Sequence, residues 1–220
     1  MNEWMPKLME LALFIPVLVI SLGIHEWAHA YAAYKLGDNT ANSLGRMTIN
    51  PIAHIDMVGT LIFPIVGFLS SLPLFGWATP VPVNPNNLKN ERKDMAFIAA
   101  AGPASNIILA VLCTFILSQM PGDISTTTQG MMGATKKMLF MYAIPLNIAL
   151  AIFNLLPIYP LDGSRILDVF ISRELSAKIK QNAGIIQMVF LLAIFTGALR
   201  FIAYPIHIIY AFLLKLFNIY

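Results

Sequence analysis

The sequence predicts an all-α polytopic membrane protein with about five transmembrane helices, a re-entrant segment and short membrane-associated β-strands. Composition is the first reason: 58% of the 220 residues are hydrophobic and 11% are charged, whereas soluble domains carry about 25% charged residues. Several apolar runs also approach the roughly 20 residues that a helix needs to cross a bilayer. We expect one domain over 1–220, with its core at about 8–170 and a C-terminal helical hairpin at about 183–220.

Five apolar runs have the composition of membrane helices. The first has charges of both signs near its start, at Glu3, Lys7 and Glu10. It therefore lacks the positive region that opens a cleavable signal peptide, and we expect it to remain as a membrane anchor. The five expected helices lie at about 8–34, 95–120, 138–156, 183–198 and 202–219.

Two stretches between the first two helices are not typical of spanning helices. Residues 43–49, Ser-Leu-Gly-Arg-Met-Thr-Ile, have the character of a strand and turn. Residues 58–76 are apolar but are interrupted by five glycines and prolines, which break regular structure. These are Gly59, Pro64, Gly67, Pro73 and Gly76.

The most informative motif is His25-Glu26-Trp27-Ala28-His29, in the last third of the first apolar run. Residues i and i+4 of a helix share a face, so His25 and His29 can bind one metal ion. Glu26 is rotated by about 100° from His25, close enough to handle the proton of a water molecule at that ion. A chance occurrence of this motif without function is unfavourable here. Each ionisable side chain costs about 2.5–3.5 kcal/mol to insert at the bilayer centre.

A catalytic zinc ion usually takes three protein ligands and leaves one position for water. Asp162 is a candidate third ligand, because Pro157 and Pro160 push the residues before them out of helical geometry. The helix at 138–156 should therefore unwind near Pro157 and expose Asp162. The alternative is that Asp162 only caps the helix that follows. His54 is another candidate ligand, or simply a loop histidine, and the residues alone leave these alternatives open.

A site that joins His25 to Asp162 fixes the direction of each helix. The runs at 8–34 and 138–156 both approach the site at their C-terminal ends, so they must run in parallel. The run at 95–120 must then run the opposite way, and 58–76 must dip into the membrane and return. With the N-terminus outside, ten Lys and Arg residues lie on the cytoplasmic side and four outside. Counting 58–76 as a crossing, with the N-terminus inside, gives nine against five, so the charge count barely discriminates and the metal geometry decides between the two topologies. In the topology with a re-entrant 58–76, the site lies nearer the cytoplasmic side.

Three motifs, in this order, resemble the site-2 protease family of zinc metalloproteases, which cut substrates within the membrane. They are HEWAH at 25–29, GPASN at 102–106, and Asn-Leu-Leu-Pro followed by Pro-Leu-Asp-Gly within 154–163. The stretches at 50–60 and 75–84 are similar to the compact prokaryotic branch, which has no peptide-binding PDZ domain.

The resemblance implies one Zn²⁺ per chain, bound by His25, His29 and Asp162, with Glu26 as the general base. It also implies that Asn106 and Asn154 line the cleft, where either could bind the substrate backbone or stabilise the oxyanion. The alternative is that these amides satisfy the backbone of a broken helix. We include His54 with them as a candidate substrate-binding or oxyanion residue.

The expected reaction is hydrolysis of peptide bonds within or near transmembrane segments of membrane proteins, in a prokaryotic cell membrane. The expected partners are those segments and the lipid bilayer. Nucleic acid and nucleotides are not expected, since no basic cluster alternates with exposed aromatic residues. The alternative from another class is a metal-transporting or metal-sensing membrane protein that uses the same ligands. A transport path would normally place several acids on different helices, and the sequence offers essentially one, Asp162, outside the first helix.

Overall fold

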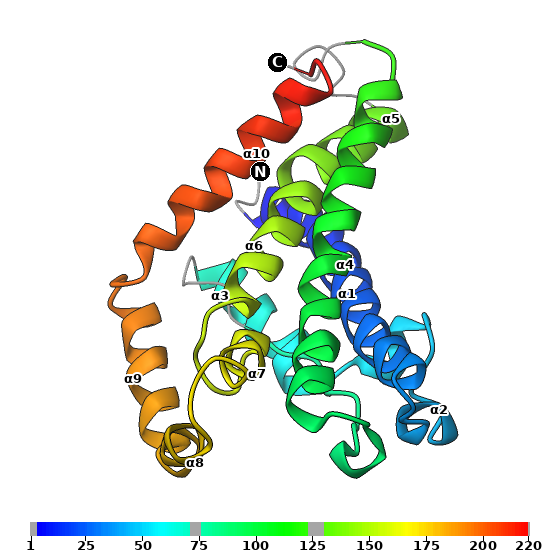
Figure 1. Ribbon diagram of the computed structural model, residues 1–220. Coiled ribbons are helices and arrows are strands. Elements are labelled where there is room, and N and C mark those ends of the chain that lie inside the picture. Colours follow the sequence, from blue (N-terminus) through cyan, green and yellow to red (C-terminus); the bar gives the residue numbers. More distant parts are fainter. Residues whose placement is uncertain (1–3, 71–75, 123–129, 220) are drawn as a thin grey trace.

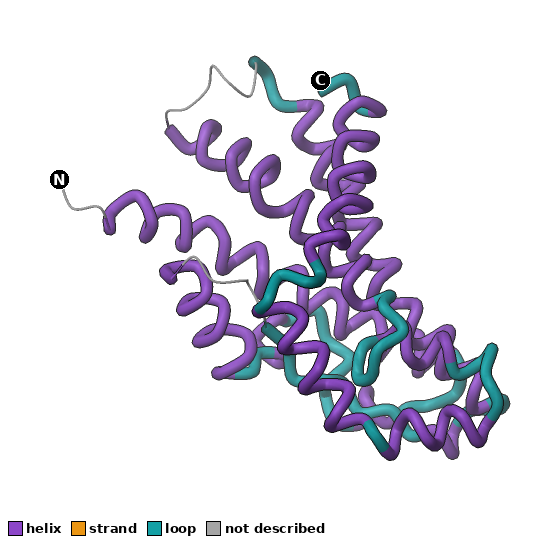
Figure 2. The backbone as a smooth tube through the Cα atoms, turned by 90° about the vertical axis from the view of Figure 1, so that its left-hand side faces the viewer, coloured by secondary structure: helices purple, strands orange, loops and turns teal. Residues whose placement is uncertain are grey.

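A computed structural model describes residues 4–70, 76–122 and 130–219. Three of its helical segments are long and apolar enough to cross a membrane: Met5–Lys35, Glu91–Gln119 and Gly130–Asn154. A fourth is possible if Arg173–Gln181 and Ala183–Phe195, which meet at a bend of 67°, form one span. The chain is therefore a helical integral membrane protein, and the expected count of five spans is not confirmed. Figure 2 shows that most of the described backbone is helical, with loops between the helices.

The three long segments pack side by side. α1 (Trp4–Lys35) and α4 (Glu91–Gln119) are single helices. The third segment is continuous through α5 (Gly130–Lys137), the π-helical η4 (Met138–Ala143) and α6 (Ile144–Asn154). In Figure 1, α1 and α6 run toward the lower end and α4 runs the opposite way, which are the directions that a shared site of His25 and Asp162 requires.

The core lies where α4 contacts both α1 and α6. Ala110 of α4 is fully buried there, and its small side chain allows the close approach that packing in membranes favours. Ile144 and Ile148 of α6 are also fully buried. Large apolar side chains on the opposite face of α4, such as Ile108 and Phe115, are about half exposed or more (59% and 49%), as a lipid-facing surface requires.

The segment expected to dip and return begins at η1 (Pro51–His54) and continues through η2 (Met57–Ile62) and α3 (Phe63–Ser70). The helical stretch Met57–Ser70 is shorter than a span. The chain then returns to its starting point: the Trp77 N–H donates to the Gly59 carbonyl (3.2 Å), and Thr60 Oγ1 donates to the Trp77 carbonyl (2.8 Å). This pairing fits a re-entrant element; Pro73, one of the predicted breaks, lies outside the described residues.

The strand expected at 43–49 is not found, and the described residues contain no strand at all. The stretch instead follows the short helix α2 (Thr40–Ser43) as turns and bends. Arg46 N–H donates back to Ala41, and the Thr48 carbonyl lies 3.0 Å from His54 Nε2. These local hydrogen bonds hold the stretch in a turn instead of an extended strand.

After α6 the chain breaks and continues through α7 (Asp162–Leu167), α8 (Arg173–Gln181), α9 (Ala183–Phe195) and α10 (Ala203–Leu216). The remaining short helices are η3 (Pro85–Asn87) and η5 (Arg200–Ile202). In Figure 1, α9 and α10 follow each other in one general direction instead of forming the expected hairpin. The turn at Gly197, where φ is +73°, redirects the chain there without reversing it.

Candidate metal centre

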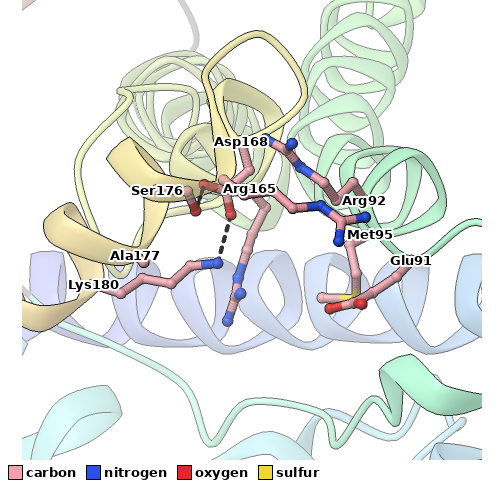
Figure 3. A pocket seen from close by; sticks show the side chains of 9 residues that line it. Glu91, Arg92, Met95, Arg165, Asp168, Ser176, Ala177 and Lys180 are labelled. Atoms are coloured by element: carbon pink, nitrogen blue, oxygen red, sulfur yellow. Dashed lines mark hydrogen bonds and ion pairs between the residues drawn. The ribbon is translucent and has the colours of Figure 1, made fainter.

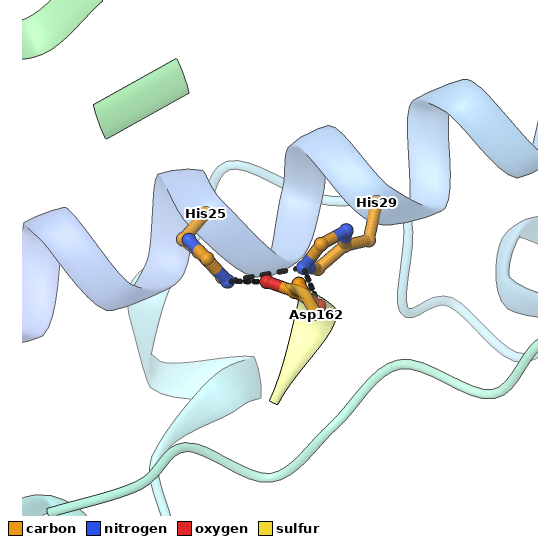
Figure 4. Close-up of side chains that lie close together, drawn as sticks. All are labelled: His25, His29 and Asp162. Atoms are coloured by element: carbon orange, nitrogen blue, oxygen red, sulfur yellow. Dashed lines mark hydrogen bonds and ion pairs between the residues drawn. The ribbon is translucent and has the colours of Figure 1, made fainter. Parts of the chain in front are cut away.

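Three potential ligands meet at the lower end of α1. His25 and His29 lie one turn apart on α1, and Asp162 is the first residue of α7. The two Nε2 atoms are 3.0 Å apart; Asp162 Oδ2 lies 3.2 Å from His25 Nε2, and Oδ1 lies 3.4 Å from His29 Nε2. Figure 4 shows both imidazoles turned toward the carboxylate. The structure therefore brings together the three residues that the sequence predicted as ligands.

The outer nitrogens of both imidazoles are held by hydrogen-bond acceptors. His25 Nδ1 lies 2.6 Å from Asn106 Oδ1, and His29 Nδ1 lies 2.7 Å from the carbonyl oxygen of Ile98. Each Nδ1 therefore donates its proton to that acceptor, and in the neutral imidazole this leaves Nε2 with a lone pair facing Asp162. Two lone pairs and a carboxylate then converge in a buried place, and a bound metal ion would relieve their mutual repulsion.

The geometry fits a zinc ion. A tetrahedral zinc with bonds of about 2.0–2.1 Å holds its ligand atoms roughly 3.3 Å apart, close to the observed 3.0–3.4 Å. Asp162 Oδ2 is buried and has no hydrogen-bond partner of its own. Gly102 of α4 lies directly against the pair, and a Cβ there would collide with both imidazole rings. α4 thus leaves just enough room for His25 and His29.

The break between α6 and α7 positions Asp162. α6 ends at Asn154, and the chain is irregular until α7 begins at Asp162, as Pro157 and Pro160 predicted. Gly163 lies so close to the end of α6 that a Cβ would collide with the Leu155 carbonyl. A larger residue would push the start of α7 away from α1, and with it the Asp162 carboxylate.

Asn106 lies behind His25, not in an open cleft. Its side chain is fully buried; besides the contact to His25, its Nδ2 donates to Asn147 Oδ1 (2.9 Å) and to the Ser21 carbonyl (3.4 Å). Both amide N–H bonds are thereby used within the protein. These contacts favour a role in positioning His25, and the expected substrate or oxyanion role of Asn106 stays a prediction.

Sequence reasoning missed Asn147 as part of the same network. Asn147 is 2% exposed, and its Nδ2 donates to Ser21 Oγ (2.9 Å) and to the Ala143 carbonyl (2.8 Å). Its amide thus joins α6 to α1, and through Asn106 to α4. The available signal was an asparagine inside an apolar run, since such residues usually hydrogen-bond across helices.

The other two candidate residues lie outside this group. Asn154 is half-buried at the end of α6 and donates one amide N–H to the Leu150 carbonyl (2.9 Å). Its role toward substrate therefore stays a prediction. His54 is buried, but it contacts the Thr48 carbonyl and is not brought to Asp162.

Glu26 is held by an extended segment that sequence reasoning did not connect to it. Its Oε2 accepts a hydrogen bond from the backbone N–H of Val81 (2.9 Å). Val81 stands between two prolines, which keep the chain extended. Arg46 secures the same segment by donating from Nη2 to the Thr79 carbonyl (2.8 Å). One carboxylate oxygen of Glu26 is thus held in place by the backbone of this segment.

Comparison with known proteins places the chain in a family. The model described as "Peptidase family M50" matches residues 13–194. The chain belongs to peptidase family M50. This M50 peptidase is 39% identical over 191 residues to "Putative zinc metalloprotease YwhC" of Bacillus subtilis, an alignment that covers 86% of this chain and 82% of that protein. Over 94 residues it is 29% identical to "Putative zinc metalloprotease Rip2" of Mycolicibacterium smegmatis, covering 43% and 35% of the two chains. No solved structure matches it significantly.

Membership confirms the resemblance to the site-2 protease family and identifies the chain as a peptidase. The matched range includes the α1 histidines, Gly102 and Asp162. The cluster at the lower end of α1 therefore lies inside the part of the chain that defines the family.

Proposed function

We propose that this M50 peptidase hydrolyses peptide bonds within or next to the transmembrane segments of membrane proteins. His25, His29 and Asp162 would hold the zinc ion that the family uses, and Glu26 would act as the general base. The observation that carries the proposal is the convergence of two Nε2 lone pairs on a buried carboxylate, at the end of a membrane helix. Two histidines that served only in packing would not need both Nε2 atoms to face a buried carboxylate.

The bound zinc ion would supply a Lewis acid that lowers the pKa of a water molecule toward about 7. Glu26 takes the proton of the attacking water and delivers it to the amine nitrogen of the leaving peptide. The Val81 N–H holds Glu26 Oε2 during this transfer, so the carboxylate keeps its direction. Asn106 and the Ile98 carbonyl keep both imidazoles in the tautomer that ligation requires.

Entry of the substrate from the lipid is supported by an apolar cavity of about 490 Å³ between α1, α3, α6 and α10. It extends to Leu22, one turn before His25, and Phe68, Leu150 and Ile206 also line it. Apolar side chains of a membrane segment suit such a lining. A helical substrate hides its carbonyls in internal hydrogen bonds, so the segment must unwind locally before hydrolysis.

We further propose that the site lies nearer the cytoplasmic side of a prokaryotic membrane. The distribution of Lys and Arg supports this orientation. With α9 and α10 running in one direction, nine of these residues lie on the side of the metal centre and four on the other, and Arg200 lies at the turn between the two helices. The two relatives described above are bacterial proteins. The single-domain organisation over 1–220 is part of the same proposal.

Mapping the cleavage position tests this function. The purified enzyme and a model single-span membrane protein are reconstituted together in liposomes, and the products are identified by mass spectrometry. We expect cuts inside the span or within a few residues of it, and none in the soluble flanks. Cleavage confined to the soluble flanks would contradict the proposal. Zinc flux into the same liposomes, without cleavage, would favour the transporter alternative.

A further inference from the structure

A second pocket, of about 250 Å³, lies at the lower end of the molecule between the start of α4, α7 and α8. Figure 3 shows charged side chains from these three elements around one space. It is separate from the apolar cavity and shares no lining residue with it. Its charged lining residues are Glu91, Arg92, Arg165, Asp168, Arg173 and Lys180.

The charges of this pocket do not cancel. Asp168 Oδ2 lies 2.9 Å from Lys180 Nζ, and Oδ1 accepts the Ser176 hydroxyl (2.6 Å), so this carboxylate is neutralised within the wall. Three arginines then remain against the single carboxylate of Glu91. The pocket therefore favours an anion.

The arginines have donors available for a ligand. Arg92 donates from Nη2 to the Ile171 carbonyl (2.7 Å), which fixes its guanidinium while its other N–H groups remain. Arg165 lies over the ring of Tyr159, 5.8 Å from its centre. Arg173 is exposed at the start of α8. Planar guanidinium groups bind phosphate oxygens in pairs, which makes phosphate the best-matched anion.

The surroundings of the pocket match a lipid more than a free anion. α8 is short and amphipathic, and it meets the apolar α9 at a bend of 67°. Beside it, Phe170 is 81% exposed and Leu175 is 47% exposed. A helix of this kind suits the membrane interface, with apolar side chains among the acyl chains and basic ones at the headgroups.

We propose that this pocket binds the phosphate of an anionic phospholipid headgroup. The inference rests on the proposed membrane placement, and basic pockets on the cytoplasmic side are suited to such headgroups. Arg165 lies one turn after Asp162 on the same short helix, α7. A bound headgroup would therefore hold α7 against α4 and steady the position of the Asp162 carboxylate.

The test compares binding of three probes to the delipidated protein in detergent: phosphatidylglycerol, phosphatidylcholine and inorganic phosphate. The variant is Arg165→Gln with Arg173→Gln. The matched control is Lys178→Gln, which removes a positive charge from the same α8 but lies outside the pocket, paired with Glu174 at 3.0 Å. We expect the wild-type protein to bind phosphatidylglycerol more tightly than the other two probes. The double variant should bind phosphatidylglycerol about tenfold more weakly than the wild type. The affinity of Lys178→Gln should be nearly unchanged.

Three results would overturn the inference. Equal binding of the two lipids would show that the pocket does not select a headgroup with net negative charge. An equal loss in Lys178→Gln would indicate general surface charge, and equally tight binding of inorganic phosphate would indicate a free-anion site. If the double variant does not fold, Arg173→Gln alone replaces it, since that side chain is exposed, and must still weaken phosphatidylglycerol binding more than Lys178→Gln does. These binding measurements do not depend on cleavage, so they fail or succeed independently of the proposed function.

Discussion

His25 Nδ1 and Asn106 Oδ1 lie 2.6 Å apart, and this contact links the candidate metal centre to the packing of the three long helices. Asn106 is held in turn by Asn147 of α6, which also reaches Ser21 of α1. The direction of the His25 lone pair therefore depends on how α1, α4 and α6 fit together. We therefore expect metal binding and helix packing to be coupled.

Replacing Asn106 with alanine should weaken zinc binding, because His25 loses the acceptor that fixes its tautomer. Loss of such an outer partner typically costs 10–100-fold in metal affinity. Competition with a chelating dye measures the affinity. Asn154→Ala is the control, since that amide donates to Leu150 at the end of α6. Equal zinc affinity in wild type and Asn106→Ala would contradict the positioning role.

Gly102→Ala should lose zinc and activity together, because the added methyl group would occupy the space of both imidazole rings. Gly184→Ala in α9 is the matched change, since a Cβ there meets nothing within 4 Å. Alanine also favours a helix over glycine, so this control should keep its zinc and melt at the same temperature or slightly higher. Metal analysis with thermal unfolding checks both. A fully loaded and active Gly102→Ala enzyme would disprove the close fit.

Val81→Pro removes the N–H that holds Glu26 Oε2. We expect kcat to fall roughly tenfold with unchanged zinc content, because the base loses its orientation while the ligands remain. Val81→Ala keeps the N–H and shortens the side chain, so it separates the hydrogen bond from packing. A similar loss of kcat in both variants would assign the effect to the side chain instead.

The sequence was sufficient for features that depend on local spacing. The i, i+4 histidines identified one ligand pair, and Pro157 and Pro160 placed the break that presents Asp162. Features that depend on contacts between distant elements were not accessible. The face that Asn106 turns to α1, and the Val81 N–H that meets Glu26, depend on the packing of helices and loops. The strand expected at 43–49 was wrong because Arg46 N–H turns back to Ala41 and His54 contacts the Thr48 carbonyl, which the local residue types do not reveal.

Asp38 predicts a dependence of stability on pH. It is buried just after α1 and accepts hydrogen bonds from Thr40, from the Asn84 N–H (2.8 Å) and from Asn87 Nδ2 (2.7 Å). Burial alone would raise the pKa of Asp38, but these hydrogen bonds outweigh it and lower the pKa below its usual value. A lowered pKa in the folded state stabilises the protein above the unfolded pKa of about 3.9, and this contribution is lost as pH falls through the folded value.

Asp38→Asn should therefore be less stable at pH 7 and should lose less stability on acidification. Thermal unfolding in detergent between pH 7 and 3 measures this difference. Glu174→Gln, which removes an exposed carboxylate (79%) on α8, should follow the wild-type curve. Parallel curves for wild type and Asp38→Asn would show that the Asp38 carboxylate does not contribute.

The most direct test of the central claim is to measure zinc content and cleavage of a model transmembrane segment on the same preparation of Glu26→Gln. Glu10→Gln on the same helix is the control, because Glu10 lies far from the site and pairs with Lys137 at 3.0 Å. We predict one zinc per chain and no cleavage for Glu26→Gln, with both properties normal in Glu10→Gln. Full cleavage by zinc-loaded Glu26→Gln would contradict the assignment of Glu26 as the base of a zinc peptidase.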